Sequence, residues 1–390
     1  MGGEEGEDPM RAVAGSIRPR RQTPEACEDL AAQLASLIIG QPAAVRQIIP
    51  YVEMFQAGLA PEGRPAGVFL LLGPTGTGKT RTVEALAEVI HGADRHLLRI
   101  DCGEYQMDHE VAKLIGAPPG YLGHRETVPM LNQQRLNAAT SERSPLSVVL
   151  FDEIEKAAPS LTRLLLGVLD RATLRLGDNT AVNFEASLIF LTSNLGAREM
   201  LRELNPDFGF QAGVPGKRPD LLEKLESIGR GAVRRMFSPE FLNRIDVVIT
   251  YQPLDAEALA AILEQQLGEL QRHLNYRLGE RAFTLEVTPE GRHWLLRRGA
   301  SAEHGARELK RILHRHLMQP LAVLVAAGRI DPGARVRVEP DPGGERLSLR
   351  VKGVGILERL PSPAPLLGAQ PQGPLRAVTA EGASLPGRCC

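Results

Sequence analysis

The stretch Gly73-Pro74-Thr75-Gly76-Thr77-Gly78-Lys79-Thr80 decides the fold of this chain. It matches the pattern G-x-x-x-x-G-K-[ST], follows the apolar run 68–72 and precedes the amphipathic stretch 80–90. A strand, a glycine-rich turn and a helix in this order form a loop whose backbone N–H groups surround phosphate oxygens. The alternative is a glycine-rich turn without a ligand. The strand and helix on either side favour a nucleotide site, in which Lys79 reaches the terminal phosphates and Thr80 offers its hydroxyl to Mg²⁺.

Apolar runs alternate with amphipathic stretches on both sides of this loop. Besides 68–72, strands are predicted at 97–101, 148–152, 187–192 and 246–250. Such alternation is typical of a parallel sheet covered by helices. We therefore predict an α/β fold.

The pattern changes after Pro253. We expect a long helix from about residue 255, a helix opened by Thr288-Pro289-Glu290, and a further helix over 306–326. Short strands are predicted at 283–287, 335–338 and 347–351. The predicted organisation is a disordered tail at 1–22, a large domain at 23–253, a small helix-rich domain at 254–352, and a Pro/Gly/Ala-rich disordered tail at 353–390.

Composition narrows the class of protein. The 390 residues include 46 Lys and Arg against 47 Asp and Glu, a formal net charge of -1, which disfavours a general nucleic-acid binder. No apolar run reaches the roughly 18 residues of a membrane-spanning helix, and the acidic start is unlike a signal peptide. The four cysteines, at 27, 102, 389 and 390, form neither a disulfide framework nor a zinc site. We predict a cytoplasmic protein.

Two carboxylates end the apolar run Val148-Val149-Leu150-Phe151-Asp152-Glu153. Asp152 is a candidate ligand for Mg²⁺, and Glu153 is a candidate acceptor for the proton of an attacking water. Taken alone, the pair is equally explained as the acidic start of a helix. The phosphate loop favours the catalytic interpretation, because nucleotide hydrolysis needs such a partner.

Six motifs in the same order resemble the Clp family of AAA+ protein unfoldases, and in particular the second ATPase module of ClpB and ClpC. Besides the phosphate loop and the segment around Asp152, they include an adenine-side segment at Ile39-Gly40-Gln41 and a sensor strand ending in Asn194. The others are an arginine-finger segment containing Arg244 and a second sensor containing Arg307. The resemblance runs from about residue 38 to 351. It implies a five-stranded parallel sheet with a small lid domain, and ATP with Mg²⁺ as cofactors.

The resemblance also implies a role for each of these polar residues. Asn194 would orient the attacking water with Glu153. Arg244 would act on the ATP of a neighbouring subunit, so that the active form would be a homo-oligomer, a hexameric ring. Arg307 would act on the nucleotide of its own subunit. The alternative for both arginines is an ordinary exposed position on a helix.

A candidate substrate loop lies at 114–123, in which Tyr121 and Leu122 follow Pro118-Pro119-Gly120. In the Clp family this loop lines a central pore and grips polypeptide, a task that suits a flat amphipathic ring. The alternative is a turn capped by an aromatic residue. The sequence departs from the family after Gly123, which leaves substrate preference open.

The tripeptide Phe208-Gly209-Phe210 is a weak candidate for peptidase docking, since such a pattern is more often a turn. No protease constellation is present in the sequence, so the chain itself is not predicted to be a peptidase. A single module behind a short N-terminal segment favours substrate-restricted or adaptor-dependent action.

The predicted function is therefore an ATP-dependent unfoldase that acts on polypeptides. Three alternatives stay open: a motor dedicated to one complex, a regulatory scaffold that binds ATP with little turnover, and the unfoldase subunit of a two-component protease. Neither a nucleic acid nor a membrane is an expected partner.

Overall fold

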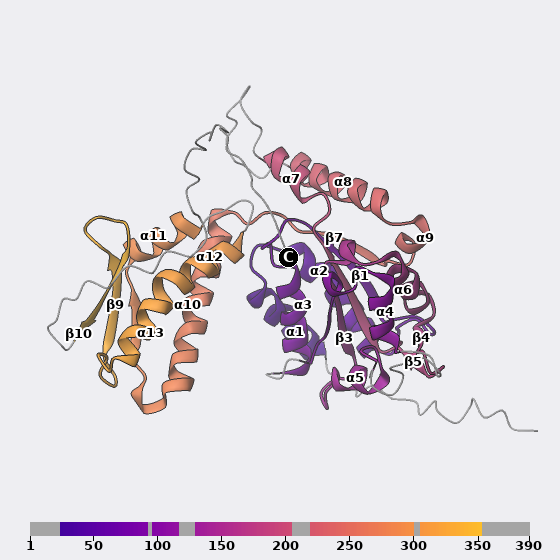
Figure 1. Ribbon diagram of the computed structural model, residues 1–390, viewed down its shortest axis with the longest axis horizontal. Helices are drawn as coiled ribbons and strands as arrows, with labels where there is room; N and C mark the ends of the chain where they lie inside the picture. The colour runs from indigo at the N-terminus through magenta and orange to yellow at the C-terminus, as the bar shows by residue number, and fades with distance from the viewer. Residues whose placement is uncertain (1–23, 93–95, 117–128, 205–218, 300–304, 353–390) are drawn as a thin grey trace, which may run out of the picture. The chain divides into compact units, whose positions relative to one another are not determined.

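The computed structural model describes residues 24–92, 96–116, 129–204, 219–299 and 305–352. Its largest sheet has five strands in the order β2-β3-β6-β1-β7, and every neighbouring pair is parallel (Figure 1). The strands are β1 (Gly67–Leu72), β2 (Leu98–Asp101), β3 (Ser147–Asp152), β6 (Ser187–Ser193) and β7 (Val247–Thr250). This arrangement confirms the predicted α/β fold with a five-stranded parallel sheet.

The three central strands are buried at every position. Parallel strands covered by helices on both faces read as continuous apolar runs. Successive side chains of β1 enter different clusters: Leu70 packs with residues of α4 to α6, whereas Phe69 packs with residues of α1 to α3. The two faces of the sheet thus carry separate halves of the core.

The helices and short elements of this part follow one another along the chain. The helices are α1 (Pro24–Leu37), α2 (Pro42–Gln56), α3 (Lys79–His91), α4 (Asp108–Ile115), α5 (Gln133–Ala138), α6 (Pro159–Arg171), α7 (Ala197–Leu204), α8 (Pro219–Met236) and α9 (Pro239–Leu242). Shorter elements are η2 (Cys102–Glu104), η3 (Ile154–Lys156) and a two-stranded sheet of β4 (Thr173–Arg175) and β5 (Ala181–Asn183).

The C-terminal part has its own core and its own sheet. Its helical elements are α10 (Ala256–Leu278), η4 (Gly279–Arg281), α11 (Pro289–Gly299), α12 (Ala306–Leu313), η5 (His314–Met318) and α13 (Gln319–Ala326). The strands β8 (Thr284–Val287), β9 (Arg335–Pro340) and β10 (Leu347–Lys352) form a mixed sheet in the order β10-β9-β8. Buried side chains such as Leu263, Trp294 and Leu309 pack together as the core.

The prediction of one continuous helix over 306–326 is wrong in one respect. The segment is helical throughout, but His314–Met318 forms a π-helix between α12 and α13. Pro320 explains the interruption, because it has no N–H to donate to the carbonyl of His316 four residues earlier.

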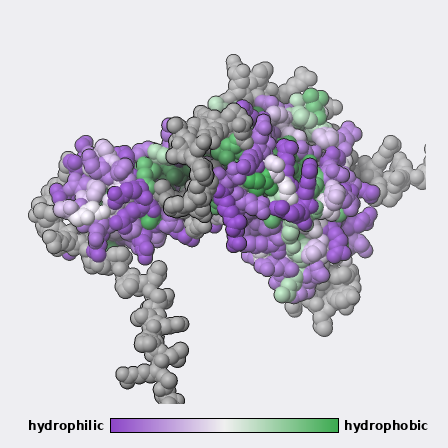
Figure 2. Space-filling view, turned by 90° about the horizontal axis from the view of Figure 1, so that it is seen from above, coloured by the Kyte–Doolittle hydropathy of each residue, from purple (hydrophilic) through white to green (hydrophobic). Residues whose placement is uncertain are grey.

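Several sequence predictions lie outside the described residues: both tails, Tyr121 and Leu122, and Phe208-Gly209-Phe210. Within the described part, no helix combines the length and the apolar character that crossing a membrane requires. On the face shown in Figure 2, hydrophilic residues cover most of the described surface and apolar residues gather in small patches.

Candidate active site

The loop between β1 and α3 has the backbone shape that its glycines permit. Gly73 has φ 144°, Gly76 φ 78° and Gly78 φ 100°, all in the region that favours glycine. A Cβ atom on Gly73 would lie 2.7 Å from the backbone oxygen of Tyr251. Glycine is therefore required at this position both by its torsion angle and by the close approach of a second chain segment.

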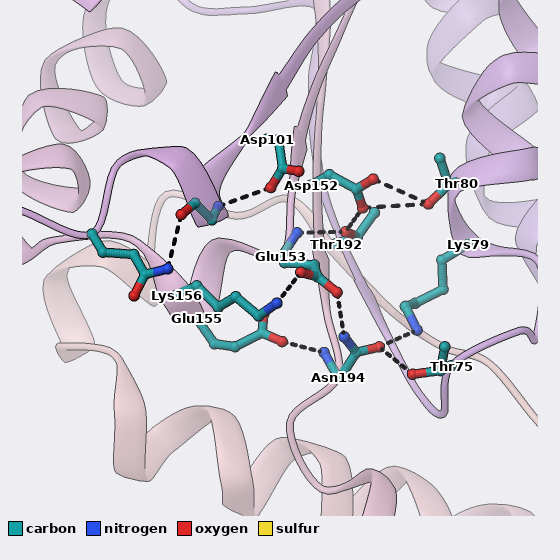
Figure 3. Close-up of polar contacts among 12 residues, drawn as sticks. Thr75, Lys79, Thr80, Asp101, Asp152, Glu153, Glu155, Lys156, Thr192 and Asn194 are labelled. Carbon is teal, nitrogen blue, oxygen red and sulfur yellow. Dashed lines mark hydrogen bonds and ion pairs between the residues drawn. The ribbon is translucent and has the colours of Figure 1, made fainter. Parts of the chain in front are cut away.

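Lys79 lies at the start of α3 and is buried. Its Nζ donates to the carbonyl of Gly73 at 2.7 Å and to that of Pro74 at 2.9 Å. It also donates to Oδ1 of Asn194 at 2.9 Å (Figure 3). The loop therefore folds around its own cation.

The carboxylates around Lys79 oppose the effect of its burial on its pKa. Burial lowers the pKa of Lys79 to about 8, while the carboxylates of Glu155, Asp152 and Glu153 act in the other direction and Arg307 lowers the pKa further. The site thus combines one buried cation with three carboxylates, a set of charges suited to a polyphosphate with a divalent cation.

Asp152, the last residue of β3, is buried and accepts several hydrogen bonds. Thr192 Oγ1 donates to its Oδ1 at 2.5 Å, and Arg99 donates to its Oδ2 at 2.5 Å. Thr80 Oγ1 lies 3.3 Å from the Oδ1 atom of the same carboxylate. The predicted pair Thr80 and Asp152 therefore does come together.

Glu153 has a backbone conformation that is rare for residues other than glycine. Its φ is 57° and its ψ is 50°, in the left-handed region. Its N–H donates to Thr192 Oγ1 at 3.0 Å, Asn194 Nδ2 donates to its Oε1 at 3.3 Å, and Lys156 pairs with its Oε2. Surrounding contacts therefore hold a conformation that is unfavourable by itself.

Asn194 links the elements of the site, because it follows β6 directly and contacts residues that come after β1 and residues that come after β3. Its Oδ1 accepts from Lys79 and, at 3.5 Å, from Thr75 Oγ1. Its backbone N–H donates to Glu155 Oε1 at 3.0 Å. Together with its bond to Glu153, these contacts join the phosphate loop to the acidic segment after β3.

The segment Ile39-Gly40-Gln41 lies between α1 and α2. Ile39 is half-buried. Gln41 is buried, and its Nε2 donates to the carbonyl of Gln252 at 2.7 Å and to that of Thr77 at 3.3 Å. The segment predicted to face the adenine side is thus hydrogen-bonded to the phosphate loop.

The two predicted arginines have different surroundings. Arg244 is partly buried and pairs with Asp170 at 3.6 Å and with Glu240 at 3.2 Å, neither of which belongs to the network around Lys79. Next to Arg307, the N–H of Ala306 donates to the carbonyl of Gly76 at 3.1 Å. Within this chain the structure therefore brings Arg307 near the phosphate loop and leaves Arg244 among residues of α6 and α9.

Sequence reasoning missed the contacts of three residues with the site: Arg99, Thr192 and Glu155. A signal was available for Thr192, which is a polar residue in the otherwise apolar run of β6, two positions before Asn194. Glu155 was likewise visible as a third carboxylate after β3. The contact of Arg99 with Asp152 was not visible in the sequence, because it depends on which strand lies beside β3.

The oxygen donors of the site fit Mg²⁺. Thr80 supplies a hydroxyl and Asp152 a carboxylate, and Mg²⁺ is usually bound by one or two such protein groups with phosphate oxygens and waters. Among the described residues no three His, Cys, Asp or Glu side chains form a metal cluster. The donors of Thr80 and Asp152 suit a Mg²⁺ ion that binds together with a nucleotide.

Comparisons with known proteins agree with this geometry. Residues 64–248 match the family "AAA domain (Cdc48 subfamily)", and residues 254–338 match "C-terminal, D2-small domain, of ClpB protein". The chaperone protein ClpB of Meiothermus ruber is 38% identical over 312 residues, which are 80% of this chain and 34% of that protein. ClpB of Brucella suis biovar 1 is 37% identical over 318 residues, covering 82% of this chain and 33% of that protein.

A solved structure shows the same similarity to the Clp chaperones. A closed-state cryo-EM reconstruction of Hsp104 with ATPγS and FITC casein has a TM-score of 0.70 and 28% sequence identity, and the match covers 84% of this chain and 52% of that one. This chain spans about a third of the length of the curated relatives it matches. With a phosphate loop on a parallel sheet, an AAA domain and a following ClpB-type D2-small domain, the chain belongs to the Clp family of AAA+ ATPases.

Proposed function

We propose that this chain hydrolyses ATP and uses the energy to unfold or remodel polypeptides. One observation carries the proposal: the side chain of Asn194 hydrogen-bonds both to Lys79 and to Glu153. The cation of a phosphate loop and a carboxylate suited to accept a proton are thereby held in one network, which is the arrangement that phosphoryl transfer to water requires.

Each side chain of the network then has a task. The backbone of residues 73–78 and the Lys79 ammonium hold the phosphates, while Thr80 and Asp152 hold Mg²⁺. When bound, Mg²⁺ neutralises negative charge on the phosphate oxygens. Glu153 accepts the proton of the attacking water, and the amide of Asn194 keeps that carboxylate and the water in place.

Two arginines supply further positive charge in this proposal. A guanidinium beside the transferred group stabilises the charge that gathers there and raises the rate by several orders of magnitude. Arg307 acts within its own subunit. Arg244 acts on a neighbour in a homo-oligomeric, hexameric ring, so it leaves Asp170 and Glu240 when subunits assemble.

Glu153→Gln tests the site. The amide fits the space of the carboxylate and cannot accept a proton, so ATP binding stays and hydrolysis falls by at least about a hundredfold. Glu226→Gln, on exposed α8, is the control for loss of a carboxylate. Hydrolysis by Glu153→Gln at the wild-type rate would refute the assignment of the base.

Mixed subunits test the action of Arg244 on a neighbour. Arg244→Ala alone keeps nucleotide affinity and loses hydrolysis. Mixing it with Glu153→Gln subunits restores part of the activity, because an intact Arg244 from one variant then faces an intact Glu153 of the other. No recovery in mixed rings that demonstrably assemble would argue against action between subunits.

Substrate threading is a separate part of the proposal and depends on Tyr121 and Leu122. The Hsp104 reconstruction was determined with casein, a polypeptide. Tyr121→Ala keeps basal ATP hydrolysis and loses its stimulation by an unfolded protein, because the ring that supplies contact area is removed. Equal stimulation in wild type and variant would leave a dedicated motor or an ATP-binding scaffold as the better explanation.

We also propose the domain boundary near residue 253, between the two family matches. A cytoplasmic location remains a prediction from cysteine usage. An adaptor and a docked peptidase remain predictions without further support.

A further inference from the structure

Glu155 contacts the site at a point that the proposed mechanism does not use. It lies in η3, directly after Ile154, and is partly buried. Its Oε1 accepts the backbone N–H of Asn194 at 3.0 Å (Figure 3). Its Oε2 is buried, and no group in the described part of the chain hydrogen-bonds to it. The carboxylate is therefore committed to one partner, the main chain of Asn194.

The backbone of Asn194 needs such a partner because it lies just beyond the sheet. The pairing of β6 with β3 ends at Leu191, and its pairing with β1 ends at Ser193. Asn194 is partly buried, and an N–H that is shielded from water is unfavourable unless another group accepts its hydrogen bond. A carboxylate makes the stronger, charge-assisted form of that bond.

We propose that Glu155 is a positioning residue for ATP hydrolysis, which holds the main chain of Asn194 so that its amide joins Lys79 to Glu153. This inference rests on the proposed function of the site. Glu155 acts through Asn194 and does not itself touch the nucleotide.

The arrangement explains why one short segment carries three carboxylates. Asp152 contacts Thr80, Glu153 contacts the amide of Asn194, and Glu155 contacts the N–H of the same asparagine. Glu153, just before η3, thus fixes Asn194 through its side chain, and Glu155, within η3, fixes it through its main chain. Two-point attachment determines the direction of the side chain as well as its position.

Two substitutions separate the hydrogen bond from the charge. Glu155→Gln retains an oxygen that accepts the N–H of Asn194, whereas Glu155→Ala removes the acceptor. We expect kcat for ATP to fall at least about tenfold in Glu155→Ala, with KM changed by less than about threefold, because a misplaced orienting group slows the chemical step. Glu155→Gln retains most of kcat. Glu226→Ala, on exposed α8, is the matched control and leaves both constants unchanged.

Hydrogen exchange supplies a readout without nucleotide. In the full chain, the amide of Asn194 exchanges at least about tenfold faster in Glu155→Ala than in wild type or Glu155→Gln, measured by mass spectrometry on peptides that span 192–196. Circular dichroism on each variant verifies that the fold is retained. Glu155→Gln keeps the test decisive if Glu155→Ala does not fold, since loss of kcat with the protection of Asn194 retained in Glu155→Gln would show that charge, not position, is required.

The outcomes distinguish this inference from the proposed function. If wild type does not hydrolyse ATP, the proposed function fails, while the exchange comparison still decides whether Glu155 holds Asn194. If Asn194 exchanges equally in wild type and Glu155→Ala, or if kcat is unchanged in Glu155→Ala, the positioning role is refuted.

Discussion

Acid destabilisation should depend on His91, at the end of α3. The side chain is 4% exposed, and its Nδ1 lies 2.8 Å from Ser141 Oγ. Burial, with the nearby ring of His96, lowers the pKa of His91 to about 4. The folded protein therefore keeps His91 neutral under conditions in which an unfolded chain protonates it.

The size of the effect follows from the two pKa values. An unfolded histidine has a pKa of about 6.5, so the unfolded state binds the proton first as the pH falls. The neutral side chain of His91 leaves stability intact above that value, and stability is lost as the pH falls from about 6.5 to about 4. Between pH 7.5 and pH 5 the loss is about 2 kcal/mol in the free energy of unfolding.

Urea unfolding of wild type and His91→Gln, followed by circular dichroism at both pH values, measures this loss. The glutamine retains a polar contact with Ser141 and does not titrate. The difference in stability between wild type and variant should therefore change by about 2 kcal/mol in favour of the variant on going from pH 7.5 to pH 5. An unchanged difference would refute a buried, neutral His91.

Two further predictions concern other parts of the chain. Trp294, the single tryptophan, packs edge-on against His316 with ring centroids 5.2 Å apart, and burial lowers the pKa of that histidine. The midpoint of acid quenching of tryptophan fluorescence should therefore lie below about pH 6.5, and the quenching should be absent in His316→Gln; quenching that persists in the variant would contradict the assignment. Arg99→Gln removes the 2.5 Å ion pair with Asp152, so half-maximal nucleotide binding should need severalfold less Mg²⁺, and an unchanged Mg²⁺ titration would show that the two cations do not compete.

The chemistry-bearing residues were predictable because they stand at strand ends. Lys79, Asp152, Glu153 and Asn194 come after or at the ends of β1, β3 and β6. The carboxyl ends of parallel strands meet at one edge of a sheet, so polar residues placed there converge whatever the details of the connecting segments. Chain order and the apolar runs were sufficient for this part of the site.

The remaining contacts depend on geometry that no local pattern reveals. Arg99 reaches Asp152 only because β2 lies beside β3 in the sheet. Glu155 reaches the main chain of Asn194 only because Glu153 takes a left-handed conformation that turns the segment. The task of Arg244 involves a second chain, so neither the sequence nor the structure of one chain contains its partner.

The central claim is that the loop from Gly73 to Thr80 holds ATP through Lys79. Calorimetric titration with a slowly hydrolysed ATP analogue and Mg²⁺ tests it, using wild type, Lys79→Ala and the control Lys224→Ala, whose lysine is exposed on α8. Wild type and Lys224→Ala should bind one nucleotide per chain, and Lys79→Ala should lose at least about a hundredfold in affinity, because the phosphates lose their buried cation. Equal affinity of wild type and Lys79→Ala would contradict the account.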